Sequence, residues 1–347
     1  MKKLINKLSA EHNLTDSELK FLLENITDED LTYLHKKARE CADGVYGKKI
    51  FIRGLIEFTN YCKNNCYYCG IRCGNKNVSR YRLNKDDILS CCREGYALGF
   101  RTFVLQGGED PFFTDGILCD IVKSMREEFP QCAITLSVGE RSYESYKMLK
   151  SSGANRFLLR HETAHCEHYS KLHPQNMSFD NRMKCLKNLK DLGYQVGCGF
   201  MVGSPFQNTD CLVKDLRFIK EFSPEMVGIG PFIKHKDTPF KDEPNGSVRL
   251  TLMLLSIIRL LVPEVLLPAT TALGTASEKG RETGILAGAN VVMPNLSPLN
   301  VREKYTLYNN KISTGEEAAQ SVELLKNSMA EIGYTVVTQR GDNIKFN

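Results

Sequence analysis

The sequence predicts an α/β protein, a (β/α)8 TIM-type barrel of residues 50–347 with a short helical extension at residues 1–49. Short apolar runs bounded by glycine or polar residues alternate with amphipathic helical patterns, which is typical of repeated βα units. Eight such runs are present, and eight parallel strands joined by crossover helices close most economically into a barrel. An open, doubly wound sheet is the alternative arrangement of the same units.

The predicted elements follow one another without an internal repeat or a long linker. In the extension, Thr15 and Thr27 are each followed three residues later by an acidic residue, which predicts the starts of two short helices. The predicted strands lie at 52–58, 102–106, 133–138, 156–160, 196–202, 226–232, 265–269 and 290–293. The predicted helices between and after them lie at 85–98, 116–128, 143–150, 180–192, 211–221 and 316–332.

The composition is that of an ordinary globular protein, with 42% hydrophobic and 25% charged residues. A net charge of +5 over 347 residues gives no reason to expect nucleic acid as a partner. No long apolar run follows the lysines at the start of the sequence, so we expect a cytoplasmic protein. The apolar stretch 250–267 is interrupted by Arg259, Pro263 and Glu264, which favours a buried helix running into a strand over a membrane span.

Three cysteines follow the first predicted strand in a C-x3-C-x2-C spacing, at Cys62, Cys66 and Cys69. Three thiolates this close can bind three irons of one 4Fe-4S cubane. The fourth iron then lacks a protein ligand, and an open coordination position is what distinguishes catalytic from structural metals. Cys73 extends the spacing, so a closed zinc or ferredoxin-like site is the alternative. The position of the cysteines after a predicted strand favours a catalytic over a structural metal site, because the active sites of barrel enzymes lie where the strands end.

The spacing, with Tyr68 before the last cysteine, resembles the motif of the radical S-adenosylmethionine (SAM) superfamily. The resemblance implies that a 4Fe-4S cluster cleaves SAM reductively to a 5′-deoxyadenosyl radical, with Tyr68 near the adenine. Gln106-Gly107-Gly108-Glu109, which ends the second predicted strand, resembles the element that binds the amino group of SAM. Without the cysteines, Tyr68 would be read as a barrel-rim residue and the two glycines as a turn.

A finer resemblance, to the HydE family of FeFe-hydrogenase maturases, runs from about residue 52 to about residue 305. It is carried by the segments 105–111, 159–164, 228–232, 268–272 and 288–295. It implies a role in assembling the two-iron subcluster of the hydrogenase. The implied substrate is a cysteine-bound iron carbonyl cyanide complex delivered by a companion maturase, and the implied reductant is a protein such as ferredoxin or flavodoxin.

The same resemblance implies which residues contact SAM and the substrate. The further contacts of SAM are Ser137, Glu162, Arg182 and Met201. Those around the substrate are Thr135, Arg160, Thr270, Thr271, Met293 and Tyr305. A guanidinium and hydroxyls suit an anionic complex. As single residues, Arg160 is equally expected to be an ion-pair partner of Glu162, and Thr270 and Thr271 to be β-branched strand residues.

Other functions remain open at this point. A mutase like methylornithine synthase would use the same barrel, whereas a biotin synthase needs a further cluster for which the sequence offers no convincing cysteine set. No cysteine follows Cys211, so the second C-terminal cluster of some HydE proteins is not expected. A non-enzymatic protein would use Cys62, Cys66, Cys69 and Cys73 as a closed metal site.

The other cysteines and the histidines give weaker signals. Cys91, Cys92, Cys119, Cys132 and Cys185 lie in helix or strand patterns and are expected to be small core or surface residues. The spacing of the histidines is irregular, which favours surface or rim positions over a metal site. These histidines are His161, His165, His168 and His173.

Overall fold

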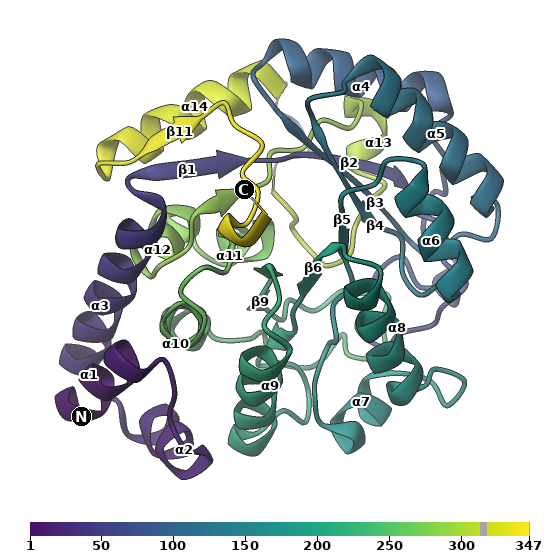
Figure 1. The fold of residues 1–347 in the computed structure, drawn as a ribbon. Helices are drawn as coiled ribbons and strands as arrows, with labels where there is room; N and C mark the ends of the chain where they lie inside the picture. Colours follow the sequence, from purple (N-terminus) through teal and green to yellow (C-terminus); the bar gives the residue numbers. More distant parts are fainter. Residues whose placement is uncertain (313–317, 347) are drawn as a thin grey trace.

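The centre of the computed structural model, which describes residues 1–312 and 318–346, is a ring of parallel strands (Figure 1). Most of the ring is a six-stranded sheet. Its strands are β2 (Gly54–Thr59), β3 (Thr102–Gly107), β4 (Ala133–Ser137), β5 (Arg156–Leu158), β6 (Gln195–Cys198) and β8 (Met226–Val227). These strands pair in chain order, except that β6 pairs with β8.

Isolated bridges close the ring. Met226 bridges to Leu266, and Pro268 bridges to Val291 in β10 (Val291–Val292). Leu55 in β2 bridges to Asn295, just beyond β10. The six sheet strands, the segment 265–268 and β10 thus make eight parallel members, which confirms the (β/α)8 barrel, and the open sheet is wrong.

Two of the expected strands are interrupted. Beyond β6 and β8, the chain resumes pairing as β7 (Met201–Val202) and β9 (Gly230–Pro231). The break lies at Gly199, whose φ is +155°, and a Cβ there would stand 2.0 Å from the carbonyl oxygen of Gly228. The two backbones approach too closely at this point for any side chain, so a regular ladder cannot continue.

A further strand pair extends the ring at the amino ends of the strands. β1 (Lys49–Ile52) lies directly before β2 and pairs with β10 and with β11 (Thr335–Val337), both in parallel. The sequence analysis did not predict β11. Its three residues are too few to show the period of a strand.

The expected crossover helices surround the ring, as Figure 1 shows. They are α4 (Lys85–Ala97), α5 (Asp115–Glu128), α6 (Tyr143–Ser151), α8 (Phe179–Asp191), α9 (Thr209–Phe222), α10 (Val248–Leu261) and α14 (Ala318–Glu331). Residues 316 and 317 of the last expected helix lie outside the described residues. The sequence did not predict the short helices α7 (Cys166–Leu172), α11 (Thr271–Ala276), α12 (Gly280–Leu286) and α13 (Leu299–Arg302), nor the 3-10 helix Ile344–Phe346.

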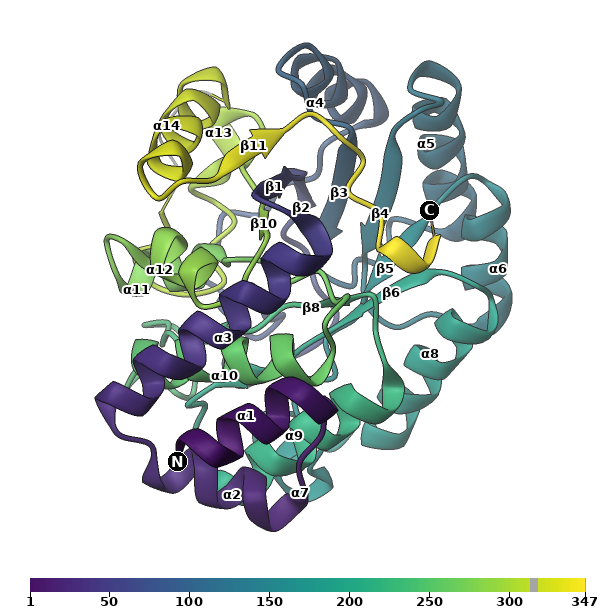
Figure 2. The same cartoon turned by 60° about the vertical axis from the view of Figure 1, so that its left-hand side comes forward.

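The N-terminal segment forms three helices, so the expectation of two short ones is wrong. They are α1 (Lys2–Glu11), α2 (Asp16–Asn25) and α3 (Asp28–Tyr46), and α1 was missed because no side chain caps its start. Thr15 and Thr27 do cap α2 and α3, as expected. Figure 2 shows α1 and α3 alongside α10, whose apolar surface they cover, and α2 beside α9. No helix among the described residues is long and apolar enough to cross a membrane.

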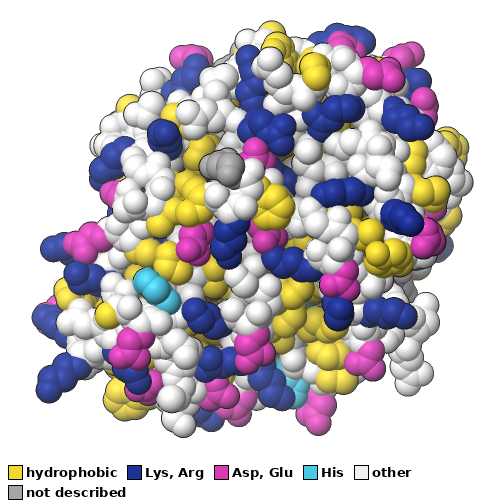
Figure 3. All heavy atoms as spheres, in the orientation of Figure 1, with side chains coloured by type: hydrophobic (Ala, Val, Ile, Leu, Met, Phe, Trp, Pro, Cys, Tyr) yellow, Lys and Arg dark blue, Asp and Glu magenta, His cyan; other side chains and the backbone are white. Residues whose placement is uncertain are grey.

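The amino ends of the strands are covered by the end of the chain, which lies over the middle of the ring in Figure 1. Arg156 donates to Asp342 Oδ1 at 2.7 Å, and Thr102 Oγ1 donates to the Arg340 carbonyl oxygen at 2.7 Å. On this face basic and acidic side chains are interspersed (Figure 3). The carboxyl ends of the strands, at the opposite end of the ring, carry the candidate site.

Candidate functional site

The cysteine loop, residues 60–81, follows β2 and is held by side chains rather than by regular structure. Asn60 Nδ2 donates to the carbonyl oxygens of Ser79 (2.9 Å) and Lys304 (2.7 Å), while its Oδ1 accepts from the Tyr81 amide. Arg80 donates to the carbonyl oxygen of Ile71 at 2.7 Å. Because these bonds join the two ends and the middle of the loop, its conformation is fixed without a strand or a long helix.

Cys62, Cys66 and Cys69 are half-buried and line a cavity of about 320 Å³ at the carboxyl ends of the strands. Burial raises the pKa of all three thiols, that of Cys69 to about 12. Bare thiolates would therefore be unfavourable here, and a cationic metal centre would stabilise them. Cys73 is exposed and is not among the residues that line the cavity.

The end of β3 is in close backbone contact with the cysteine loop. The Gly108 amide donates to the Thr59 carbonyl oxygen at 3.3 Å, and a Cβ on Gly108 would lie 2.2 Å from the Tyr61 carbonyl oxygen. A side chain at this position would displace the loop, so the glycine is required by the close approach. The next residue, Glu109, faces the cavity and accepts from the Glu140 amide at 3.0 Å.

Glu162 and Arg182 form the polar wall of the cavity together with Arg160. Glu162 has a left-handed backbone, with φ 64°, and its Oε2 lies 3.5 Å from Arg160 Nη2 without a hydrogen bond from any described residue. Arg182 Nε donates to Glu140 Oε1 at 2.5 Å, and its Nη1 donates to the Arg160 carbonyl oxygen. Burial by itself lowers the pKa of Arg182, but Tyr169 and the carboxylates of Glu140 and Glu162 raise it above its usual value. Arg182 is therefore a fixed positive charge.

Tyr68 is oriented by a buried histidine. His173 Nδ1 donates to the Tyr169 carbonyl oxygen at 2.9 Å, and burial lowers the pKa of His173 to about 4. The ring is therefore neutral, and its Nε2 accepts from the Tyr68 hydroxyl at 3.2 Å. This contact holds Tyr68 against the cavity from the side of α7.

The expectation of surface or rim histidines is wrong for His161, His168 and His173, which are buried. One ring nitrogen of each of the first two is hydrogen-bonded inside the protein: the Gly199 amide donates to His161 Nδ1, and His168 Nε2 lies 3.0 Å from the Pro205 carbonyl oxygen. His161 Nε2 also lies 3.3 Å from Asp215 Oδ1. Such polar contacts make the burial of an imidazole tolerable. His165 is partly buried.

Every predicted site residue except Thr135 and Thr271 lines the cavity. Thr135 is fully buried, two residues before Ser137 on β4, and its Oγ1 has no hydrogen-bond partner among the described residues. Thr271 is the first residue of α11. Thr270 lines the cavity but is not a strand residue, because its Oγ1 caps α11 by accepting from the Leu273 amide.

The chain is similar to known proteins in sequence and in fold. Residues 56–219 match the family model of the radical SAM superfamily. The sequence is 46% identical over 284 residues, 82% of this chain and 81% of the relative, to the [FeFe] hydrogenase maturase subunit HydE of Thermotoga maritima. The chain belongs to the radical SAM superfamily.

This radical SAM enzyme has three further similarities to known proteins. It is 31% identical to 3-methylornithine synthase of Methanosarcina barkeri over 91% of this chain and 89% of the relative. Its structure matches that of a methylornithine synthase with a TM-score of 0.86 and 28% identity, over 96% of this chain and 97% of the other. The hydrogenase maturase HydG matches with a TM-score of 0.80 at 21% identity, over 96% of this chain and 75% of the other, which shows a shared fold.

The cavity suits the SAM and iron–sulfur cluster of the radical SAM superfamily. No three His, Cys, Asp or Glu side chains among the described residues converge on one metal ion. Cys62, Cys66 and Cys69 all line the cavity, and in a cubane each thiolate would bind a separate iron. The unsatisfied Glu162 Oε2, at the cavity wall, fits a ligand that brings its own hydrogen-bond donors, such as an ammonium group.

The sequence analysis of this radical SAM enzyme missed the partners that hold the site. Glu140 binds Arg182 and Glu109, and the buried Glu57 pairs with Lys311. An acidic residue inside an apolar strand, as Glu57 is, was the available signal, because such a group is rarely buried without a partner. Its partner, which lies 254 residues further along the chain, gave no signal of its own.

Proposed function

We propose that this radical SAM enzyme is a hydrogenase maturase of the HydE kind, acting on a cysteine-bound iron carbonyl cyanide complex during assembly of the two-iron subcluster. The observation that carries the proposal is the 46% identity to HydE, which exceeds the 31% identity to methylornithine synthase. In the cell, the complex would come from a companion maturase and the electrons from a protein such as ferredoxin or flavodoxin, in the cytoplasm.

Cys62, Cys66 and Cys69 would hold a 4Fe-4S cluster whose fourth iron takes SAM. When bound, the cluster supplies the electron that cleaves SAM to a 5′-deoxyadenosyl radical. The chain's own residues would position SAM: Glu109, with the two glycines before it, and Glu162 would accept from its ammonium group, and Tyr68 would provide a ring face for the adenine.

On the substrate side, Arg160 Nε and Nη2 have no hydrogen-bond partner among the described residues although they are buried. Guanidinium donors that make no hydrogen bond, although Nη2 lies 3.5 Å from Glu162 Oε2, suit the carboxylate or cyanide groups of an anionic complex. Met201 and Met293 contribute apolar surface to the same cavity. An apolar, partly closed site excludes water from a reactive radical. Excluding water is what the protein contributes, while the cofactor supplies the radical chemistry.

Methylornithine synthase is the second candidate because its structure matches over nearly the whole chain. Its substrate would be lysine, which is a zwitterion rather than an anionic iron complex. The two candidates therefore differ in what Arg160 binds.

The test uses the reconstituted enzyme with purified companion maturases and apo-hydrogenase, and measures hydrogen evolution. Activity should depend on adding this enzyme, and Arg160→Gln should abolish it while SAM binding persists. Lysine in place of the maturation mixture should not stimulate SAM cleavage. Lysine-dependent cleavage without support of hydrogenase activity would contradict the proposal and favour the mutase.

A further inference from the structure

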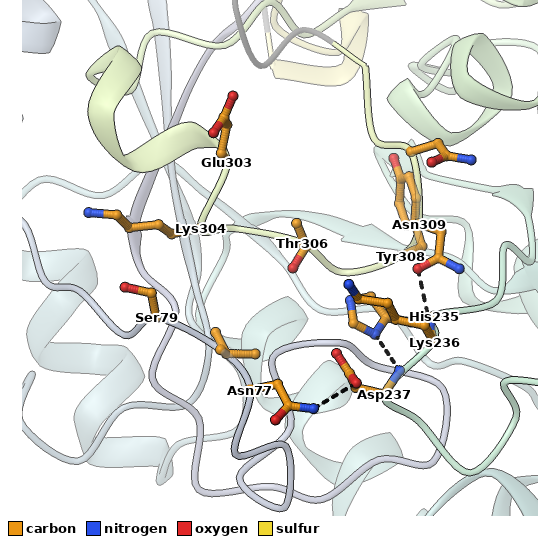
Figure 4. Close-up of a pocket in the computed structure, with 12 residues that line it drawn as sticks. Asn77, Ser79, His235, Lys236, Asp237, Glu303, Lys304, Thr306, Tyr308 and Asn309 are labelled. Carbon is orange, nitrogen blue, oxygen red and sulfur yellow. Dashed lines mark hydrogen bonds between the residues drawn. The ribbon is translucent and has the colours of Figure 1, made fainter.

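The loop 303–311, between α13 and α14, is a wall between two cavities. Tyr305 and Leu307 line the inner cavity, whereas Lys304 and Thr306 line an outer pocket of about 690 Å³. Figure 4 shows this outer pocket, and Tyr308, labelled there beside Asn309, lines both cavities. A shift of this loop would therefore change the shape of the substrate cavity.

The same loop supports the cysteine loop. The Gly70 amide, next to Cys69, donates to the Leu307 carbonyl oxygen at 2.9 Å. A Cβ on Gly70 would lie 2.1 Å from the Thr306 carbonyl oxygen, so the two backbones are in direct contact. Asn60 adds the bond to the Lys304 carbonyl oxygen. Movement of the wall would thus reach the cysteines as well as the substrate cavity.

Neither a helix nor a strand holds residues 303–311 in the described structure, and one buried ion pair spans from the loop to the barrel strands. Lys311 Nζ donates to Glu57 Oε1 at 2.5 Å and to the Tyr305 carbonyl oxygen at 3.1 Å. It also lies 4.9 Å from the centre of the Tyr305 ring. The side chains of Lys311 and Glu57 are 5% and 1% exposed.

Glu57 is in turn fixed on the barrel side. Its Oε2 accepts from Asn295 Nδ2 at 2.9 Å, so the carboxylate joins β2 to the segment after β10. The desolvation free energy of burying two charges nearly cancels their electrostatic attraction. An apolar pair of the same size would therefore stabilise the fold as well. The ion pair instead fixes the position of the loop, because each of its hydrogen bonds has a defined geometry that places Lys311 and the residues before it.

We propose that Glu57 and Lys311 are positioning residues that hold the 303–311 loop in place as the cavity wall and as the support of the cysteine loop. The effect on maturation rests on the proposed function, whereas the fixing of the loop does not. A test in the metal-free protein therefore separates the two.

The first experiment measures amide hydrogen exchange by mass spectrometry in the metal-free protein. Lys311→Met should speed exchange at least about tenfold in peptides covering 303–311 and 69–75, because the wall and its contact at Gly70 are released together. Lys190→Met is the matched control, since Lys190 pairs with Glu225 at 2.5 Å at the other end of the barrel. It should leave both peptides unchanged, and an unchanged rate in Lys311→Met would overturn the proposal.

A double variant, Glu57→Leu with Lys311→Met, removes both charges and separates positioning from charge compensation. The thermal midpoint should recover relative to Lys311→Met, while exchange in 303–311 stays fast. In the reconstituted enzyme, both variants should broaden the electron paramagnetic resonance signal of the SAM-bound cluster, whereas Lys190→Met should not. Restoration of slow exchange by the double variant would show that the pair only compensates charge, and the proposal would be wrong.

Discussion

The two ends of the barrel each hold a carboxylate beside a guanidinium, and they differ in how its oxygens are bonded. At the amino ends of the strands, Asp342 Oδ1 accepts from Arg156 and Gln195 at 2.7 Å each, and its Oδ2 accepts from Arg340 at 2.8 Å. At the carboxyl ends, Glu162 Oε2 is buried without a hydrogen bond from any described residue. Both groups have a guanidinium near them, but only Asp342 is bonded to it.

This difference in hydrogen bonding shows which end of the barrel has polar groups available to bind a ligand. A carboxylate whose oxygens are all bonded internally contributes to stability and has nothing left to offer a ligand. A carboxylate left unsatisfied costs free energy until something binds it, and such groups are expected at functional sites. Changes at the amino ends should therefore alter unfolding, and changes at the carboxyl ends should alter binding.

The largest expected effect is at the cysteines. Cys66→Ser should abolish assembly of the cluster, because a hydroxyl does not replace a thiolate ligand of iron. Iron and sulfide content after anaerobic reconstitution measures this. Cys73→Ser is the control and should retain the full content, since Cys73 is exposed and away from the cavity. Equal loss in both variants would mean a closed four-cysteine site.

Asp342→Asn should lower the free energy of unfolding by about 3 kcal/mol at neutral pH, because Arg156 is left buried without its charge partner. Burial alone would raise the pKa of Asp342, but the charge of Arg156 and the hydrogen bonds from Arg340 and Gln195 lower it. The pKa of Asp342 is lower in the folded state than in the unfolded state, where it is ~3.9, so ionised Asp342 stabilises the fold above that pH. This stabilisation is lost as the pH falls towards the pKa of the folded state.

Denaturant unfolding at several pH values checks this prediction. The gap between Asp342→Asn and the unchanged protein should be full at pH 7 and should narrow below about pH 4. SAM binding should not change. A gap that stays constant down to the acid limit would show that the charge of Asp342 is not what stabilises this end.

Glu162→Gln should weaken SAM binding by about 10- to 100-fold, because a charge-assisted bond to the ammonium group is lost. Stability should change by less than about 1 kcal/mol, since the pair with Arg160 is partly exposed and not hydrogen-bonded. Isothermal titration of SAM into the reconstituted protein, with thermal unfolding alongside, measures both. Loss of stability with unchanged affinity would reverse the comparison between the two ends.

The smallest expected effect comes from Tyr68→Phe, which removes the hydroxyl that His173 accepts from. One hydrogen bond of about 1 kcal/mol corresponds to a decrease in SAM affinity of about fivefold. Tyr67→Phe is the control, because the ring contact of Tyr67 with Phe240 does not involve the hydroxyl. The same titration should rank Tyr68→Phe between Tyr67→Phe and Glu162→Gln.

The sequence predicted the barrel because each buried strand is an apolar run, as in the run that became β3, and runs are a local signal. The cysteines, Gly108 and Glu162 were also found locally, from their motifs, and the structure brings them to one cavity. The extra helix α1 was missed because it lacks a capping side chain.

What the sequence could not show depends on contacts between distant residues. In the sequence, nothing distinguishes Lys311 from a surface lysine, and only the fold shows that it pairs with Glu57. Arg160 and Glu162 were equally well described as an ion pair or as ligand contacts, and the structure shows a 3.5 Å pair whose hydrogen bonds are not made. Thr135 stays a predicted substrate contact, although it does not line the cavity, because it lies two residues before Ser137 on the same strand.

We propose that Cys62, Cys66 and Cys69 hold a cluster with one iron left open for SAM. Electron paramagnetic resonance of the anaerobically reconstituted, reduced protein, recorded with and without SAM, tests it most directly. Adding SAM should shift the g-values of the reduced cluster, and Cys73→Ser should behave in the same way. A spectrum that SAM leaves unchanged would contradict it, because every iron would then already have its full set of ligands.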